Sequence, residues 1–249
     1  TGELSVQSAL DFETGAGSTQ TLTILVRDND VLSFSATATV TIQLEDANDP
    51  PAVAPQSFTL AENSPPGALV GRVQAVDGDA GANGTLTFAI GSGNADGRFA
   101  LHPTTGEVTV AGPLDFESRN RFDLTLSVTD GGTPPWSATA PLVIRVSDVN
   151  EAPAIGGQTF SVDENAPVGT LVGQVAALDP DASPDHLFSI EAGPEDGPFG
   201  IDPGSGRITV RGPLDFETRS SFGLSVKVAD RANPLLPHTA LITVSVNNI

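Results

Sequence analysis

The acidic residues of this chain stand in short clusters that recur along the sequence. The tetrapeptide Leu-Asp-Phe-Glu occurs three times, at residues 10–13, 114–117 and 214–217. Residues two apart in extended chain share a face, so Asp115 and Glu117 are expected to point one way while Phe116 points into a core. Two carboxylates about 4 Å apart repel by about 4 kcal/mol at an effective dielectric near 20. Such repeated pairs predict a bound cation.

Other acids keep a fixed order around this tetrapeptide. Glu62 stands in "EN", Asp77 and Asp79 form "DGD", and Asp130 ends an alternating segment; the second copy has Glu164, Asp179, Asp181 and Asp230 at these places. The segments "DANDPP" at 46–51 and "DVNEAP" at 148–153 add further acids together with asparagines. Carboxylate, amide and carbonyl oxygens are hard ligands, which favour calcium over zinc or copper.

The composition supports a cation-binding role and excludes several others. The 249 residues include 31 acidic and 11 basic ones, a net charge of −20, which argues against nucleic acid and against an anionic membrane surface as partners. No cysteine is present, so neither disulfides nor thiolate metal sites stabilise the chain. The sequence contains no run of 18 apolar residues, so we expect no direct membrane insertion of this segment. One Lys against ten Arg favours a bacterial source.

The clusters lie in a repeat of about a hundred residues, which sets the expected domain organisation. Residues 61–79 match 163–181 at an offset of 102. We therefore expect a partial repeat at 1–49, containing only its C-terminal half, and full repeats at 50–151 and 152–249. Alternating apolar residues, as in 124–128 and 242–246, with many Gly and Pro, predict short strands in an all-β Greek-key sandwich.

The order of these motifs resembles the extracellular repeats of cadherins. "AEN" and "DEN" resemble the early Glu motif of that family, "LDFE" its Asp/Glu pair, and "DANDPP" and "DVNEAP" its junction. "DGD" and "DPD" resemble its DxD, and "TDGGTPP" and "VAD" its late Asp. The resemblance covers essentially the whole chain. It implies tandem Greek-key, Ig-like β-sandwich repeats in a calcium-bridged rod, and a cadherin-like protein of bacterial type is one form this could take.

The resemblance also implies ligands for up to three calcium ions at each complete junction. Near residue 150, where Glu151 replaces the Asp usual in the family, the implied ligands are Glu62, Asp115, Glu117, Asp148, Asn150, Glu151, Asp179, Asp181 and Asp230. Near residue 49 they are Asp11, Glu13, Asp46, Asn48, Asp49, Asp77, Asp79 and Asp130. The second set lacks an early Glu, so we expect only part of it to bind calcium well. Glu164, Asp215 and Glu217 have no following repeat here and are expected to bind metal weakly.

Other readings of these residues remain open. The acids could be an ordinary solvated surface, and Asp115 with Glu117 could be a glycosidase pair, but their repetition argues for a structural role and against an enzyme. Phe34, Trp136 and Leu236 each follow a late Asp by six residues, which predicts core packing for Trp136 over sugar stacking. The three histidines do not recur at matched positions and are predicted to be surface residues.

The resemblance implies a calcium-rigidified segment of an extracellular, cell-surface adhesion protein that serves cell–cell or cell–surface adhesion. Its partners would be other adhesion molecules, bound homophilically or heterophilically. A polysaccharide-binding module of a bacterial secreted protein and a passive spacer are the alternatives. Leu22, Ile24 and Val26 belong to half a sandwich, so we also expect a second chain or an upstream segment to complete residues 1–49.

Overall fold

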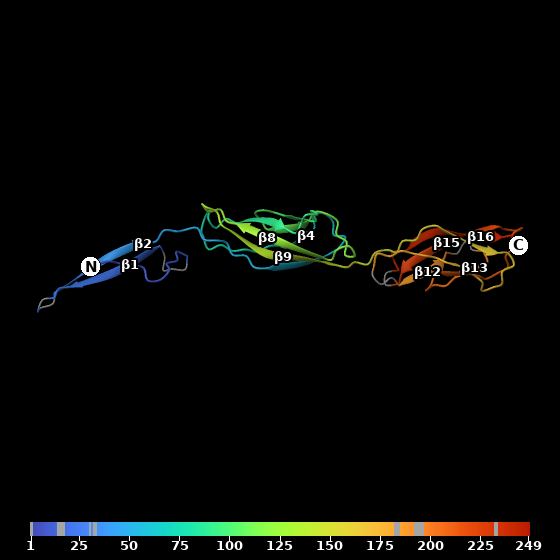
Figure 1. Cartoon of the computed structure of the whole chain (residues 1–249), viewed down its shortest axis with the longest axis horizontal. Helices are drawn as coiled ribbons and strands as arrows, with labels where there is room; N and C mark the ends of the chain where they lie inside the picture. The colour runs from blue at the N-terminus through green and yellow to red at the C-terminus, as the bar shows by residue number, and fades with distance from the viewer. Residues whose placement is uncertain are drawn as a thin grey trace. The chain divides into compact units, whose positions relative to one another are not determined.

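The computed structural model describes residues 2–13, 18–29, 31, 34–181, 185–191, 197–231 and 234–249. Every regular element in these ranges is a β-strand, as predicted (Figure 1). By contacts the chain divides into two compact units, residues 1–115 with 119–147 and residues 116–118 with 148–249. Within the described ranges, no helix is long and apolar enough to cross a membrane.

The first unit begins with a two-stranded antiparallel hairpin. Strand β1 (Thr19–Arg27) pairs along its whole length with β2 (Ser35–Gln43), from Thr19 opposite Gln43 to Arg27 opposite Ser35. These two strands form a sheet of their own. The apolar side chains of Leu22, Leu25 and Val26 are exposed.

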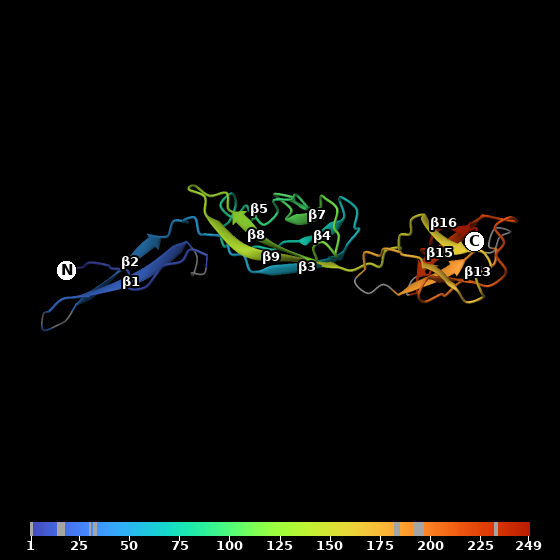
Figure 2. The same ribbon diagram turned by 45° about the vertical axis from the view of Figure 1, so that its right-hand side comes forward.

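The remainder of the first unit is a sandwich of two sheets. Its strands are β3 (Gln56–Ala61), β4 (Leu69–Arg72), β5 (Thr87–Ser92), β6 (Phe99–Leu101), β7 (Glu107–Val110), β8 (Arg121–Thr129) and β9 (Ser137–Ser147). One sheet has the order β3-β9-β8-β5 and the other β4-β7-β6. Figure 2 shows β4 and β7 lying across from β3 and β9. The first strand, β3, runs parallel to the last, β9, while the other pairs are antiparallel.

The second unit repeats this arrangement strand for strand. Its strands are β10 (Gln158–Asp163), β11 (Leu171–Gln174), β12 (His186–Ile190), β13 (Phe199–Ile201), β14 (Arg207–Val210), β15 (Ser221–Asp230) and β16 (His238–Asn247). The sheets have the orders β10-β16-β15-β12 and β11-β14-β13. Again the first and last strands, β10 and β16, are parallel neighbours.

Alternation of side chains builds the core of each sandwich. Along β8, Phe122, Leu124, Leu126 and Val128 are buried, with more exposed residues between them. Strand β15 buries its alternate residues from Phe222 to Val228 in the same way. Burying a side chain of this size contributes about 1.5–3 kcal/mol. These cores position the strand ends and turns that carry the acidic residues.

Candidate metal centres

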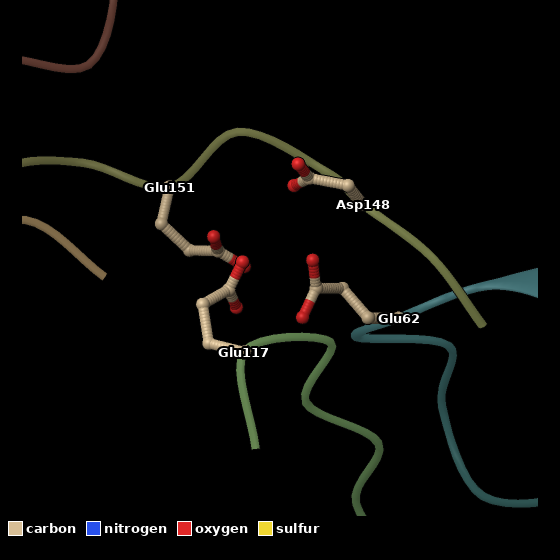
Figure 3. A group of neighbouring side chains, drawn as sticks. All are labelled: Glu62, Glu117, Asp148 and Glu151. Atoms are coloured by element: carbon tan, nitrogen blue, oxygen red, sulfur yellow. The ribbon is translucent and has the colours of Figure 1, made fainter. Parts of the chain in front are cut away.

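Four carboxylates converge at one end of the sandwich of residues 56–147. One oxygen each from Glu62, Glu117, Asp148 and Glu151 lies within 4.8 Å of the other three (Figure 3). Glu62 follows β3, Glu117 belongs to the second Leu-Asp-Phe-Glu copy, and Asp148 and Glu151 follow β9. Figure 3 shows the four side chains pointing toward one another. All four were predicted as ligands, and their mutual repulsion favours a cation among them.

The backbone fixes Glu62 in this group. Its N–H donates to the carbonyl of Ser147 (3.0 Å), and the N–H of Asn63 donates to the carbonyl of Leu114 (3.2 Å). Asn63 has a φ of 56°, in the left-handed region that Asn tolerates better than most residues. The chain therefore turns directly after Glu62, whose residue is only 3% exposed.

The Leu-Asp-Phe-Glu copies form turns, so the extended conformation predicted for them is wrong. The N–H of Arg119 donates to the carbonyl of Asp115, and Arg219 does the same with Asp215, both at 2.9 Å. Leu114 and Leu214 anchor the turns in the cores. Glu117 reaches its cluster from this turn, whereas Asp115 is not a member of it.

The acids near residue 49 form a smaller group. Glu13, Asp46 and Asp79 each place a carboxylate oxygen within 4.8 Å of the others. Desolvation raises the pKa of Glu13, and the charges of Asp46 and Asp79 raise it further. The N–H of Glu13 donates to Asp11 (2.9 Å), which keeps that predicted ligand beside the group. Among the described residues, this group contains no counterpart of Glu62.

Asn48, which belongs to this junction segment, is hydrogen-bonded to Asp130. Asn48 Nδ2 donates to Asp130 Oδ2 (3.0 Å) and to the carbonyl of Pro134 (3.2 Å). A Cβ on Gly132 would collide with the Asn48 side chain, so this approach requires glycine. Burial disfavours the charged form of Asp130, but hydrogen bonds from Trp136 N, Gly132 N and Asn48 outweigh it and lower its pKa.

The two Asp-x-Asp segments have the same backbone arrangement. Asp79 N donates to Asp77 Oδ1, and Asp181 N to Asp179 Oδ1, both at 3.0 Å. These bonds fold each segment into a bend. Asp181 lies among like charges. Burial is the largest cause of its raised pKa, and the charges of Asp179 and Asp148 raise the pKa further.

The junction residues contact these segments through the backbone. Asp49 N donates to Asp79 Oδ2 (2.8 Å), and Glu151 N donates to Asp181 Oδ2 (3.2 Å). Asn150 Nδ2 donates to the carbonyl of Glu151 (2.9 Å). Asp230, the late acid of the second repeat, is buried at the end of β15.

Buried oxygens test whether these residues suit a metal ion. In the described parts of the chain, Asn48 Oδ1, Asp77 Oδ2, Asp79 Oδ1 and Asp181 Oδ1 are buried without a hydrogen-bond partner. A buried oxygen without a hydrogen-bond partner normally lowers the stability of the fold by about 1–3 kcal/mol, and by more when it is charged. All four atoms belong to predicted ligands, and all are oxygens of the kind that calcium binds. The residues therefore fit a calcium ion.

A third acidic group lies at the end of the second sandwich. Oxygens of Glu164, Asp215 and Glu217 lie within 4.8 Å of one another. Glu164 Oε2 accepts from Phe216 N (3.2 Å) and Oε1 from Ile249 N (3.1 Å). These three residues correspond in order to Glu62, Asp115 and Glu117.

Trp136 does not pack in the core, contrary to the prediction. It is 51% exposed, and Phe34 and Leu236 are exposed too. Trp136 N donates to Asp130 Oδ1 (2.9 Å) and its carbonyl accepts from Asp130 N (3.0 Å). Phe34 makes the same pair of bonds with Asp28. The spacing of six residues thus reflects a backbone loop closed on the Asp, not burial.

His186 is not a surface residue either, contrary to the prediction. Its side chain is 13% exposed and its Nε2 lies 3.0 Å from Oδ2 of Asp179, whose side chain is fully buried. The sequence held one signal of this contact, because His186 begins the strand that follows the Asp-x-Asp segment. Repetition could not reveal it, since Leu86 stands at the matching place in the other repeat.

Comparison with known proteins establishes the family. The sequence profile of the Cadherin domain matches residues 56–147 and 158–247. The chain is 35% identical to mouse Protocadherin Fat 4 over 243 residues, covering 94% of this chain and 5% of that protein. It is 34% identical to mouse Cadherin-23 over 260 residues, covering 97% and 8%. The chain belongs to the cadherin family.

Solved structures agree with this assignment. The structure of repeats EC22-24 of mouse Cadherin-23 has a TM-score of 0.75 and 27% identity, covering 97% of this chain and 78% of that one. Repeats EC1-3 of Protocadherin Gamma C5 also have a TM-score of 0.75, with 29% identity and coverages of 97% and 82%. The fold is thus that of cadherin extracellular repeats. The chain spans only 5–8% of the length of the curated relatives named above.

Proposed function

We propose that calcium ions bound by these acids hold successive repeats of an extracellular adhesion protein in a fixed arrangement. The observation that carries the proposal is the set of buried, unpartnered oxygens on Asn48, Asp77, Asp79 and Asp181. Calcium bound by carboxylate, amide and carbonyl oxygens would supply their missing partner. In metal-free protein the same oxygens cost stability, because each is desolvated without compensation.

The charges explain how calcium would control the junctions. Eight carboxylates are proposed as ligands near residue 150, and without metal their repulsion favours structures that separate them. Calcium shared by residues before and after position 150 reverses this preference. Extracellular calcium-binding modules bind at about 10⁻⁴–10⁻³ M, so ambient calcium suffices.

We propose unequal occupancy of the two junctions. The set near residue 150 includes Glu62, whereas the set near residue 49 has no early Glu and gathers only Glu13, Asp46 and Asp79 among the described residues. Up to three ions would bind near residue 150. Near residue 49 the ion held by Asn48, Asp77, Asp79 and Asp130 would bind, and the others more weakly.

Adhesion to other proteins is the proposed use of the segment. The relatives are named as cadherins and protocadherins, and one solved relative is the cis-dimer of Protocadherin gammaB7 repeats EC3-6. We propose homophilic or heterophilic protein partners and a non-catalytic role, with repeats at 1–49, 50–151 and 152–249. A polysaccharide partner has no support in the comparisons.

Small-angle scattering and calorimetry test this proposal together. We expect calcium to convert a broad ensemble of shapes into a narrower one, and chelator to reverse the change. Calorimetric titration should find more than one calcium ion bound per chain. It should also resolve binding sites of higher and lower affinity. An unchanged scattering profile between calcium and chelator would refute the rigidifying role, and equal occupancy of both junctions would refute the proposed ranking.

A further inference from the structure

The contact between His186 and Asp179 distinguishes the second Asp-x-Asp segment from the first. A carboxylate only accepts hydrogen bonds, so the Nε2–H of His186 donates to Asp179 Oδ2 across 3.0 Å. The Asp179 side chain is fully buried and that of His186 13% exposed. The imidazole also packs edge-on against Phe188, with ring centroids 5.8 Å apart. Water therefore competes little for this bond.

The first repeat has a leucine in place of this donor. Strand register pairs Phe88 with Val128 and Phe188 with Val228, and His186 lies opposite Asp230. Continuing the first register by two residues places Leu86 opposite Asp130, at the place that His186 takes. Leucine cannot donate, and Asp77 Oδ2, the counterpart of the bonded oxygen, is buried without a hydrogen-bond partner.

This difference acts on the charge of one proposed ligand. In both repeats the first Asp is already oriented, because its Oδ1 accepts the N–H of the second Asp at 3.0 Å. The additional bond from His186 thus adds little orientation to Asp179. It does occupy a lone pair of Oδ2 and draws electron density from an oxygen that would otherwise face a cation.

We propose that His186 weakens calcium binding at the site containing Asp179, relative to the equivalent site containing Asp77. The inference rests on the proposed function, since it concerns the strength of those same sites. The junction near residue 150 is proposed to bind more ions than the junction near residue 49. Of the two Asp-x-Asp sites, however, the one near residue 150 would have the lower calcium affinity. His186 acts here through its hydrogen bond to Asp179 and is not itself a ligand.

Exchange of the two residues tests the proposal in the full chain at constant pH. Trp136 is the only tryptophan and its backbone bonds to Asp130, so its fluorescence reports calcium binding near residue 49. We expect Leu86→His to raise the calcium concentration at half-change about three- to tenfold. His186→Leu should lower the dissociation constant of the site that contains Asp179 by a similar factor in calorimetry.

Controls separate this effect from a general loss of stability. His102→Leu removes an imidazole whose Nδ1 accepts from the backbone of Thr104 and Thr105, and it should leave both titrations unchanged. Thermal unfolding in chelator checks that each variant folds, and if His186→Leu does not, Leu86→His still decides. In the wild type, the Nε2–H resonance of His186 should shift only at the higher calcium concentrations, which a packing role would not require.

Each outcome has a distinct meaning. Calcium binding with dissociation constants unchanged within twofold in both exchanged variants overturns the inference and leaves the proposed function intact. Weaker binding in His186→Leu also overturns it, because His186 would then strengthen the site by fixing Asp179. Absence of calcium binding in the wild type overturns the proposed function itself and the inference with it.

Discussion

The junction segments at 46–49 and 148–151 differ in how their asparagines are held. Asn48 donates across to Asp130 in the following repeat, whereas Asn150 donates to the carbonyl of its neighbour Glu151. Yet the next residue behaves alike in both, because Asp49 and Glu151 each donate a backbone N–H to the second Asp of the Asp-x-Asp segment. A backbone contact does not depend on side-chain length. Glu151 can therefore make the same contact as Asp49 despite its longer side chain.

The comparison also separates what repeats from what is local. The turn after Glu62 recurs after Glu164, with Asn63 and Asn165 both at positive φ. Within the described parts of the chain, the bond from Asn48 to Asp130 and the bond from His186 to Asp179 are each found in one copy. Copies of one motif can therefore share a backbone while differing in the partners of their charged atoms.

Neutralising the second Asp of each segment should have the largest effect. Asp79→Asn and Asp181→Asn each remove a charge and change a buried oxygen that has no hydrogen-bond partner. We expect calcium affinity at the altered junction to fall at least about tenfold, or about 1.4 kcal/mol, with the other junction unaffected. The calcium response of Trp136 fluorescence should weaken in Asp79→Asn and stay unchanged in Asp181→Asn. Equal loss at both junctions from either change would show that the sites are not independent.

A methyl group added at Gly132 should remove the bond to Asp130 that distinguishes Asn48 from Asn150. In Gly132→Ala the added Cβ would displace the Asn48 side chain and its bond to Asp130. We expect a loss of about 0.5–1.5 kcal/mol in unfolding free energy and a weaker Trp136 response to calcium. Gly156→Ala is the matched control, because nothing lies within 4 Å of a Cβ there. The two variants should differ clearly in chemical denaturation.

The smallest effect concerns Asp181 in metal-free protein. Its raised pKa means that the folded state favours the protonated form, so stability is lost as the pH rises from the ordinary Asp pKa through the raised one. Asp181→Asn should then have a higher free energy of unfolding than wild type in chelator near pH 7, by less than about 0.5 kcal/mol. The difference should fade as the pH falls toward the ordinary Asp pKa of about 3.9.

Asp123 provides a control of opposite sign for that measurement. A hydrogen bond from Arg121 lowers its pKa, so its charged form stabilises the fold and this contribution is lost as the pH falls. Asp123→Asn should therefore destabilise near pH 7, again with an effect that fades on acidification. Two variants moving in the same direction would contradict the assigned pKa shifts.

The repeat predicted most of this structure from sequence. Alternation located the long strands, and the resemblance to cadherin repeats implied that Glu62, Asp148 and Glu151 converge. Extended geometry for Leu-Asp-Phe-Glu was wrong, because hydrogen bonds such as Arg119 N to the Asp115 carbonyl have no signature in composition. Trp136 was misjudged since a recurring apolar residue was taken to imply burial. The contact of His186 was missed because it depends on strand register, which a single copy does not reveal.

The parallel pairing of first and last strands has a mechanical consequence. In the sandwich of residues 56–147, β3 and β9 lie side by side over six residue pairs, from Gln56 opposite Leu142 to Ala61 opposite Ser147. A pull on the chain entering β3 and leaving β9 acts along both strands in opposite directions. It loads the hydrogen bonds between them in shear, so they must break together and not one after another. Strands β10 and β16 repeat this arrangement, and each sandwich thus resists tension along its own strands.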